Sequence, residues 1–222
     1  MNETAKLDDG PAPGGAQDPR TAGLVAFSQN RKQDSRERLL AAAVTALSET
    51  GYTAASVEDI AAEAGLSRVT FYRHFGSKAD LVVALYEQAR ETSRSRFFGI
   101  QDQDFRDPAV VRDWIATIFA SARANRRMLY VFKQAAAAEP AFTAHAHDLM
   151  AASIAALGDA IPAFAVDPEA PGQRRRWLEA WLLLYEILDQ SNHAAIDSGV
   201  AMDPLVIDIL TDRFMRFLES AT

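Results

Sequence analysis

Apolar residues recur at helical spacing through most of the chain, and the alternating pattern typical of strands is missing. The clearest stretch runs from Ser56 to Leu85 and contains short helical patterns separated by glycine. Its first helix follows Ser56, a residue type that caps helix N-termini, with Asp59 three positions on. Val57, Ile60, Ala61 and Ala64 then share one face. The pattern predicts an all-α fold whose most ordered part is this stretch.

A second helix follows directly after a glycine turn. Gly65 ends the first helix, and Ser67 caps the next one. Phe71 and Phe75 lie four residues apart and are expected to anchor this helix to the core. The opposite face carries Val69, Thr70 and Arg73. Two short helices joined in this way are built to enter a DNA groove.

Helical patterns on both sides complete a three-helix head. Gly76 and Ser77 stop and restart the chain, and a longer helix begins at Lys78 with Leu81, Val82 and Leu85 on one face. Upstream, the pattern predicts a helix from near Asp34 to Thr50, followed by Gly51. Its apolar stripe consists of Leu40, Ala43, Val44 and Leu47.

This ordered set of residues resembles the DNA-binding domain of the TetR family of bacterial transcriptional repressors. The family's recognition helix ends in Tyr-x-His/Tyr-Phe-x-x-Lys, which matches Tyr72, His74, Phe75 and Lys78 here. The resemblance implies an all-α protein of about nine helices, with a helix-turn-helix head and a C-terminal domain for effector binding and dimerisation. The domains are then 1–30, a disordered extension, 31–78, the head, and 79–222, the C-terminal domain.

Candidate DNA contacts are predicted from the direction in which side chains of the head should point and from the family pattern. Arg68 and Thr70 lead the third helix and are candidates for base edges, since an arginine fork fits the two acceptors of guanine. Val69 could touch a thymine methyl group. Ser56 would add a phosphate contact at a helix N-terminus. The remaining candidates are Arg31 and Lys32, placed in an arm before the first helix, and Tyr72, Arg73, His74 and Lys78, which flank the recognition helix.

Each of these assignments has a plainer alternative. Arg31 and Lys32 fit equally well as a solvated basic pair. Tyr72 could pack in the core, Lys78 could be a solvated charge, and His74 could be a buried histidine.

Composition limits the function classes without changing this interpretation. The 222 residues are 49% hydrophobic and contain no cysteine, which excludes disulfides and Cys-ligated zinc. The net charge is −7, but residues 31–78 carry 7 basic and 6 acidic side chains, whereas residues 79–222 carry 14 and 20. The acidic excess therefore lies mainly outside the head. Without a signal peptide or a long apolar run, we expect a cytoplasmic protein that makes no membrane contact.

Beyond Arg96 the family resemblance fades, and helices are predicted from pattern alone. They span about 109–124, 126–139, 141–157, 173–198 and 204–220, with a Pro- and Gly-rich loop at 158–172. The last two carry broad apolar faces, which suits a twofold dimer, as the family resemblance implies, or a thick monomeric core. The predicted dimer residues are Trp177, Trp181, Leu184, Leu188, Leu210, Phe214 and Phe217.

A second stripe on the 173–198 helix predicts a ligand chamber. Asp189 and Asn192 are polar groups among apolar neighbours and need partners if they are buried. The proposed walls are Trp114, Ile118, Phe119, Tyr130, Phe142, Met150 and Tyr185, although aromatic residues at helical spacing also fit an ordinary core. The acidic C-terminal half favours a neutral or cationic hydrophobic effector.

The sequence thus predicts a homodimeric repressor that binds a palindromic DNA operator and is released by a small hydrophobic effector, with no metal and no cofactor. A ligand-independent DNA-binding dimer is one alternative. An enzyme is another, based on His145, His147, Asp148 and His193. Histidines two apart on a helix project in different directions and cannot share a metal, and no known catalytic motif is present.

Overall fold

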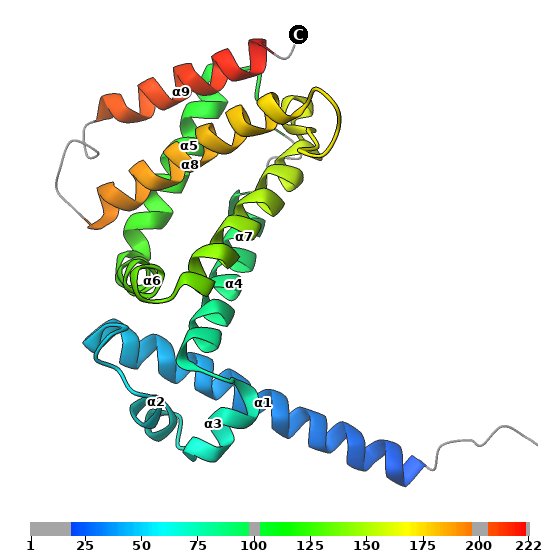
Figure 1. Ribbon diagram of the computed structural model, residues 1–222, viewed down its shortest axis with the longest axis vertical. Helices are drawn as coiled ribbons and strands as arrows, with labels where there is room; N and C mark the ends of the chain where they lie inside the picture. The colour runs from blue at the N-terminus through cyan, green and yellow to red at the C-terminus, as the bar shows by residue number, and fades with distance from the viewer. Residues whose placement is uncertain (1–18, 98–102, 197–203, 221–222) are drawn as a thin grey trace, which may run out of the picture.

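The computed structural model describes residues 19–97, 103–196 and 204–220, with 19–30, 90–97 and 141 described by their backbone only. Within these residues the all-α prediction is confirmed. The elements are α1 (Pro19–Thr50), α2 (Val57–Glu63), α3 (Arg68–His74), α4 (Lys78–Phe97), α5 (Pro108–Ala124), α6 (Arg126–Ala138), α7 (Pro140–Gly158), the 3-10 turn η1 (Pro162–Phe164), α8 (Arg174–Ile196) and α9 (Pro204–Glu219). Figure 1 shows α1–α3 as a head at one end, joined by α4 to a body of α5–α9.

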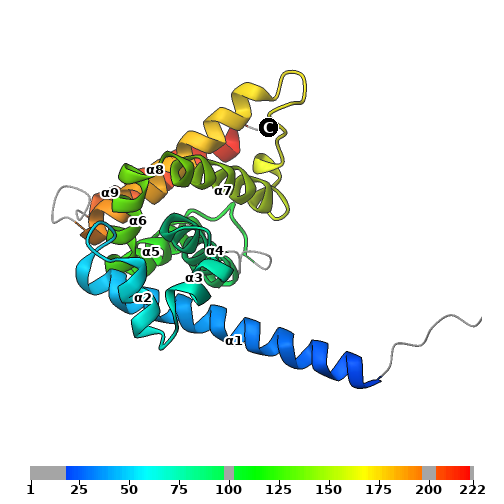
Figure 2. The same ribbon diagram turned by 60° about the horizontal axis from the view of Figure 1, so that its bottom comes forward.

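The first helix is longer than its pattern predicted. It begins at Pro19 instead of near Asp34, so residues 19–30, which were expected to be disordered, are helical. Residues 1–18 lie outside the described part of the chain. Proline suits the first helical position because its φ angle is already helical, and residues 20–50 contain no further proline that would break the helix. Figure 2 shows the N-terminal half of α1 extending past α2 and α3.

The helix-turn-helix geometry follows the predicted caps. Ser56 and Asp59 form a reciprocal capping box at the start of α2, and the Ser67 hydroxyl accepts the Thr70 N–H at the start of α3. Gly65 has a φ of +62°, a conformation that favours glycine, and this lets the chain reverse between the two helices. Phe71 and Phe75 are 0% and 5% exposed, so they anchor α3 as expected.

The head core continues into the body. Buried residues of α1–α4 form one cluster with Val131, Phe132, Ala135 and Phe142 from α6 and α7. A second cluster joins α5, α7, α8 and α9 around Phe214. Helices α4, α6 and α7 therefore lie between the head and the rest of the body.

The burial of α8 and α9 corrects the predicted dimer residues. Leu184, Leu210, Phe214 and Phe217 are at most 7% exposed and are covered by their own protomer, with Phe214 packed among the rings of α5 and η1. Helices α8 and α9 are covered by other helices of the same chain over more of their apolar surface than the sequence pattern indicated. The large apolar side chains that α8 and α9 leave exposed are instead Leu178, Leu182, Tyr185, Leu205 and Ile209.

Candidate DNA-binding head and effector chamber

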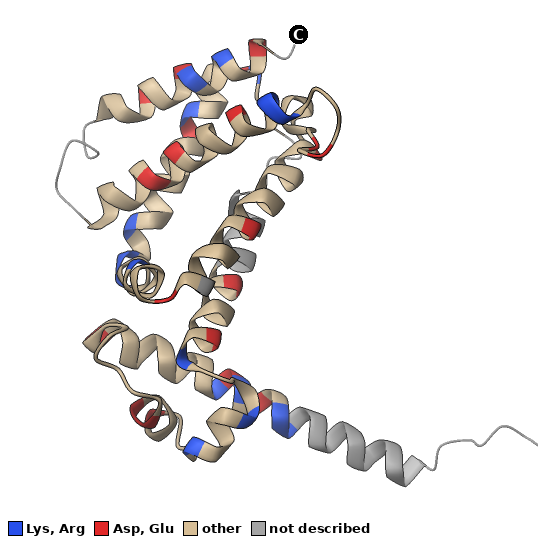
Figure 3. Cartoon of the chain, viewed as in Figure 1, with Lys and Arg blue, Asp and Glu red and all other residues tan. Residues whose placement is uncertain are grey.

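The outer face of α3 presents the side chains that the sequence assigned to base contacts. Val69 is 79% exposed and Tyr72 is 45% exposed, and Arg68 and Arg73 are also open to solvent. A valine exposed to this extent has no packing role in the protomer. Figure 3 shows basic positions on α1 and α3 at this end of the molecule.

Arg68 is held by two neighbours on the head surface. Its Nη1 lies 2.6 Å from Oε1 of Glu58 on α2, and its guanidinium carbon lies 5.4 Å from the Tyr72 ring centroid. Both members of the ion pair are more than half exposed, so water screens it. The guanidinium is thus oriented by an exposed ion pair that a competing anion can displace.

Lys78 has a different position from the phosphate contact that was predicted. Its Nζ donates hydrogen bonds to the backbone oxygens of Tyr52 and Ala55, at 2.5 and 2.7 Å, and lies 4.3 Å from the Tyr52 ring centroid. Burial lowers the pKa of this ammonium. Lys78 therefore ties the turn between α1 and α2, a long-range contact that the local pattern could not indicate.

The predicted phosphate contact of Ser56 also needs correction. The Ser56 N–H and hydroxyl both donate to the carboxylate of Asp59, at 3.0 and 2.6 Å. These hydrogen bonds lower the pKa of Asp59, so an anion of the chain itself occupies the start of α2. A phosphate there would meet this negative charge.

His74 and the basic pair near it lie at the junction of α3 with α1. The Nε2 atom of His74 is buried with no hydrogen-bond partner among the described residues. Burial, together with the charges of Arg73, Lys32 and Arg36, lowers its pKa. This fits the alternative of a packed histidine better than a phosphate contact. Arg31 and Lys32 are exposed on α1 and so lie on a helix instead of in an arm.

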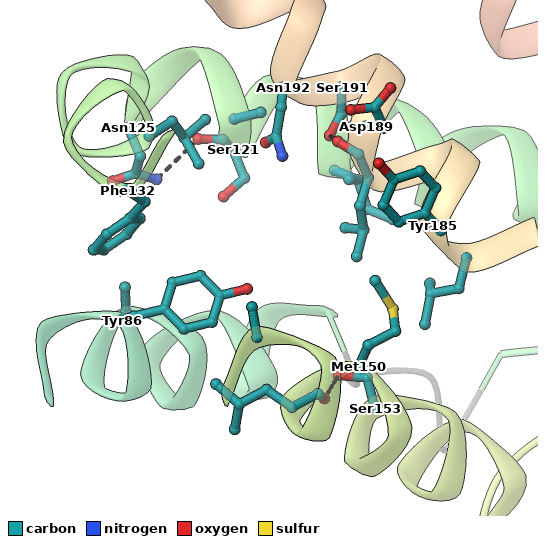
Figure 4. Close-up of a pocket in the computed structure, with 18 of the residues that line it drawn as sticks. Tyr86, Ser121, Asn125, Phe132, Met150, Ser153, Tyr185, Asp189, Ser191 and Asn192 are labelled. Atoms are coloured by element: carbon teal, nitrogen blue, oxygen red, sulfur yellow. Dashed lines mark hydrogen bonds between the residues drawn. The ribbon is translucent and has the colours of Figure 1, made fainter. Parts of the chain in front are cut away.

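A cavity of about 760 Å³ opens among α4, α5, α6, α7 and α8, which is within the range of small-molecule sites. Figure 4 shows side chains of these helices converging on it. Six of the predicted lining residues are there: Trp114, Ile118, Met150, Tyr185, Asp189 and Asn192.

Three predicted lining residues lie elsewhere. Phe119 is 2% exposed in the core of the body, and Phe142 packs beside Tyr86 and Phe132 in the head core. Tyr130 is 52% exposed on the outer side of α6. Helical spacing alone does not say which side of a helix meets a cavity. Trp181, Leu184 and Leu188, assigned to the dimer, line the chamber instead.

The wall from α4 was missed by sequence reasoning, and on α6 it chose the exposed Tyr130 in place of the residues that face the cavity. Tyr86 from α4 and Met128, Leu129 and Phe132 from α6 face the cavity. Their apolar pattern equally suits core packing, so no signal in one sequence separates the two roles. Hydroxyl and amide groups of Ser121, Asn125, Thr143, Ser153 and Ser191 also line it.

Helix α6 joins this chamber to the head. The Gln134 Oε1 accepts the Tyr52 N–H at 2.6 Å, and the Tyr52 hydroxyl donates to Glu139 at 2.8 Å. Burial and the nearby Glu139 carboxylate raise the pKa of Tyr52, so the phenol stays a donor. One short helix thus lines the cavity and holds the end of α1.

The histidines considered for an enzyme each have separate neighbours. The His145 Nε2 lies 3.1 Å from Glu87, His147 packs edge-on against Trp181, and His193 is near Asp189. In the part of the chain that is described, no three metal-binding side chains gather at one place. None of the described helices has the length and apolar character needed to cross a membrane.

The fold and this head define a helix-turn-helix protein with a helical body, and comparisons agree. Residues 39–85 match the family model of bacterial regulatory proteins, tetR family. The matched residues form the DNA-binding domain of a TetR-family regulator. It is 36% identical over 78 residues to the transcriptional regulator CymR of Pseudomonas putida, covering 33% of this chain and 38% of that protein. It is 32% identical over 85 residues to the transcriptional regulator TtgR of Pseudomonas putida, covering 38% and 40%. The chain thus matches about two fifths of these relatives' length.

Solved structures share the fold over most of the chain. A TetR-like transcriptional regulator from Rhodococcus sp. RHA1 aligns with a TM-score of 0.56 at 19% identity, covering 83% of this chain and 96% of that one. The fatty acid degradation regulator FadR from Bacillus halodurans aligns with a TM-score of 0.58 at 14% identity, covering 82% and 94%. At these identities the likeness concerns the fold alone.

Proposed function

We propose that the protein is a transcriptional repressor that binds a palindromic DNA operator as a homodimer and is released by a small hydrophobic effector. The observation that carries the DNA-binding part is the exposed face of α3, where Arg68, Val69 and Tyr72 point to solvent on a rigidly capped helix. Arg68 reads base edges, Val69 contacts a thymine methyl, and Thr70 and Arg73 add contacts to the same groove.

The dimer forms through the outward side of α8 and α9. Leu182 and Ile209 are 59% and 51% exposed, and each lies one helical turn from a member of the Arg213–Glu186 ion pair that joins the two helices. An apolar surface rimmed by charges suits a partner of the same kind. The two heads would then meet successive major grooves, about 34–36 Å apart.

Effector release proceeds through α6. An effector in the chamber contacts Phe132 and Met128, and the same helix carries Gln134, which holds Tyr52 at the end of α1. Occupancy favours a position of α6, and with it of the head, that fits the DNA spacing less well. A ligand-independent DNA-binding dimer is the second candidate, but a chamber of this size against the coupling helix favours the first.

Selection of bound sequences from random DNA duplexes tests this function. The purified protein should enrich an inverted repeat whose half-sites are about one or two helical turns apart. A variant with Arg68→Ala and Val69→Ala should lose that enrichment, whereas Thr117→Ala, on the exposed side of α5, should keep it. If the native protein enriches no sequence, the proposed function is wrong.

A further inference from the structure

The hydroxyl groups of the chamber are arranged in a way that defines its ligand. The Ser153 hydroxyl donates to the Leu149 carbonyl at 2.8 Å, and the Ser191 hydroxyl donates to the Leu188 carbonyl at 2.8 Å. The Thr143 hydroxyl donates to the Ala136 carbonyl at 3.1 Å. Because each hydroxyl has one hydrogen, these three oxygens have only lone pairs left for a ligand.

The amide of Asn125 is used in the same way. Its Nδ2 donates to the Ser121 carbonyl at 2.8 Å, which leaves Oδ1 as the acceptor. Figure 4 shows Ser121 and Asn125 on one side of the cavity and Ser153 on the other. Tyr86, Tyr185 and Asn192 add groups that both donate and accept. Acceptors therefore lie on opposite walls.

The charged side chains that line the chamber also limit the kind of ligand it can bind. Neither lysine nor arginine is among the described residues that line it; its lining carboxylate is Asp189 and its lining imidazole is His147. An anionic ligand would lose its hydration and gain no lysine or arginine of the described lining in return. The remaining wall is apolar and rich in aromatic rings, including Trp114, Phe132 and Trp181.

We propose that the effector is an uncharged aromatic molecule that carries hydroxyl groups at opposite ends, and that the chamber rejects carboxylates. One hydroxyl donates to the oxygen of Ser153 or Thr143 on one wall and the other donates to that of Ser191 or Asn125 on the opposite wall, while the rings lie between aromatic side chains. This assignment rests on the proposed function for its regulatory meaning, but the binding chemistry stands on the chamber alone.

The test is isothermal titration calorimetry of the full-length protein without DNA, using three compounds on one scaffold. These are a biphenyl with two para-hydroxyl groups, its dimethyl ether, which accepts but cannot donate, and the matching dicarboxylate. The diol should bind about ten-fold or more tighter than the ether, because lost donors leave buried acceptors unpaired. The dicarboxylate should bind weakest of the three.

Variants assign the effect to the chamber. Ser153→Ala should weaken the diol several-fold, about three- to ten-fold, and leave the ether unchanged, because only the diol uses this oxygen. Thr117→Ala is the matched control, since its hydroxyl makes the same bond to a helix carbonyl, that of Asp113, outside the cavity. Equal binding of diol and ether, tighter binding of the dicarboxylate, absence of diol binding or an unchanged Ser153→Ala variant would each overturn the proposal. If the diol binds as expected but does not release DNA, the proposed function fails and the chamber chemistry stands.

Discussion

Two cations of the head have separate tasks, which their sequence positions did not reveal. Arg68 lies on the surface of α3 with an exposed partner, Glu58, whereas Lys78 is folded onto the backbone oxygens of Tyr52 and Ala55. Helix direction singled out Arg68, and the family pattern singled out Lys78. It could not show that the long Lys78 side chain turns back toward the α1–α2 turn, because that contact joins residues more than twenty positions apart.

Substitution of these cations should therefore have different results. Arg68→Ala should leave the free energy of unfolding near that of the native protein and lower operator affinity roughly ten-fold, with weaker preference at one base position. Lys78→Met should lower the free energy of unfolding by about 1–3 kcal/mol, since two partly buried carbonyls lose their donor. Urea unfolding and titration of labelled duplexes measure the two effects. An Arg68→Ala variant with full affinity would contradict the assignment of α3.

Glu58 offers a test in the opposite direction. It is the partner of Arg68 in the free protein and places a negative charge beside the DNA-reading face. Glu58→Gln should raise affinity for cognate and scrambled duplexes alike by several-fold, about two- to five-fold, because it removes repulsion from phosphate. Glu63→Gln, on the same helix and also exposed, is the control for a general charge effect. An equal rise in DNA affinity in both variants would show that Glu58 does not lie closer to the bound DNA than Glu63 does.

His74 predicts a pH dependence of stability. Its folded-state pKa lies below the ordinary value of 6.5 because it is partly buried near Arg73, Lys32 and Arg36. As pH falls below 6.5, the unfolded chain binds a proton that the folded head resists, so stability decreases toward acid. His74→Phe should reduce this slope in urea unfolding between neutral and mildly acid pH. An unchanged slope in His74→Phe would remove His74 from this account.

For the helices, the sequence predicted where each one begins and ends better than it predicted which elements each one packs against. Caps and prolines located α5, α6, α7, α8 and α9 to within a few residues. The stripes of α8 were read as a dimer face and a ligand face, but Trp181, Leu184 and Leu188 of the first stripe all line the chamber. Apolar spacing shows that a residue is covered and does not show by what.

Placement of the dimer on the outward side of α8 and α9 gives a prediction for single residues. Leu182→Glu or Ile209→Glu should give a folded monomer, because these side chains are exposed in one protomer and charge opposes burial against a second. Phe214→Ala should instead destabilise the protomer by about 3–5 kcal/mol, since its ring is fully buried. Sedimentation and circular dichroism separate the outcomes. A Leu182→Glu protein that remains dimeric would exclude this face.

The contact between the end of α6 and the head can be tested by removing the hydroxyl group of Tyr52. Tyr52→Phe removes the donor to Glu139, and leaves a partly buried carboxylate without that bond. The free energy of unfolding should fall by about 1–3 kcal/mol. An effector should also release DNA less completely, because the head follows α6 less closely. Tyr130→Phe, on the exposed side of the same helix, is the control. Full stability and full effector response in Tyr52→Phe would exclude this contact as a link.

Across the whole molecule, basic and acidic side chains are divided unevenly between the head and the body. The acidic excess of residues 79–222 lies on the body, while the head has a small positive balance and exposed cations on α1 and α3. A protein with a net charge of −7 can therefore bind DNA through one end and avoid adhesion elsewhere. This division of charge could be predicted from the sequence, because the net charge of a segment is the sum of its residues. The chamber was only partly readable, because it is formed by five helices whose packing depends on distant contacts.

The central claim is that two heads read one operator together. Fluorescence anisotropy should compare the selected inverted repeat with the same duplex carrying one scrambled half-site, at one fixed salt concentration. Two linked heads should bind the full repeat about a hundred-fold tighter or more, because the second contact is intramolecular. Equal affinity for the two duplexes would contradict this account.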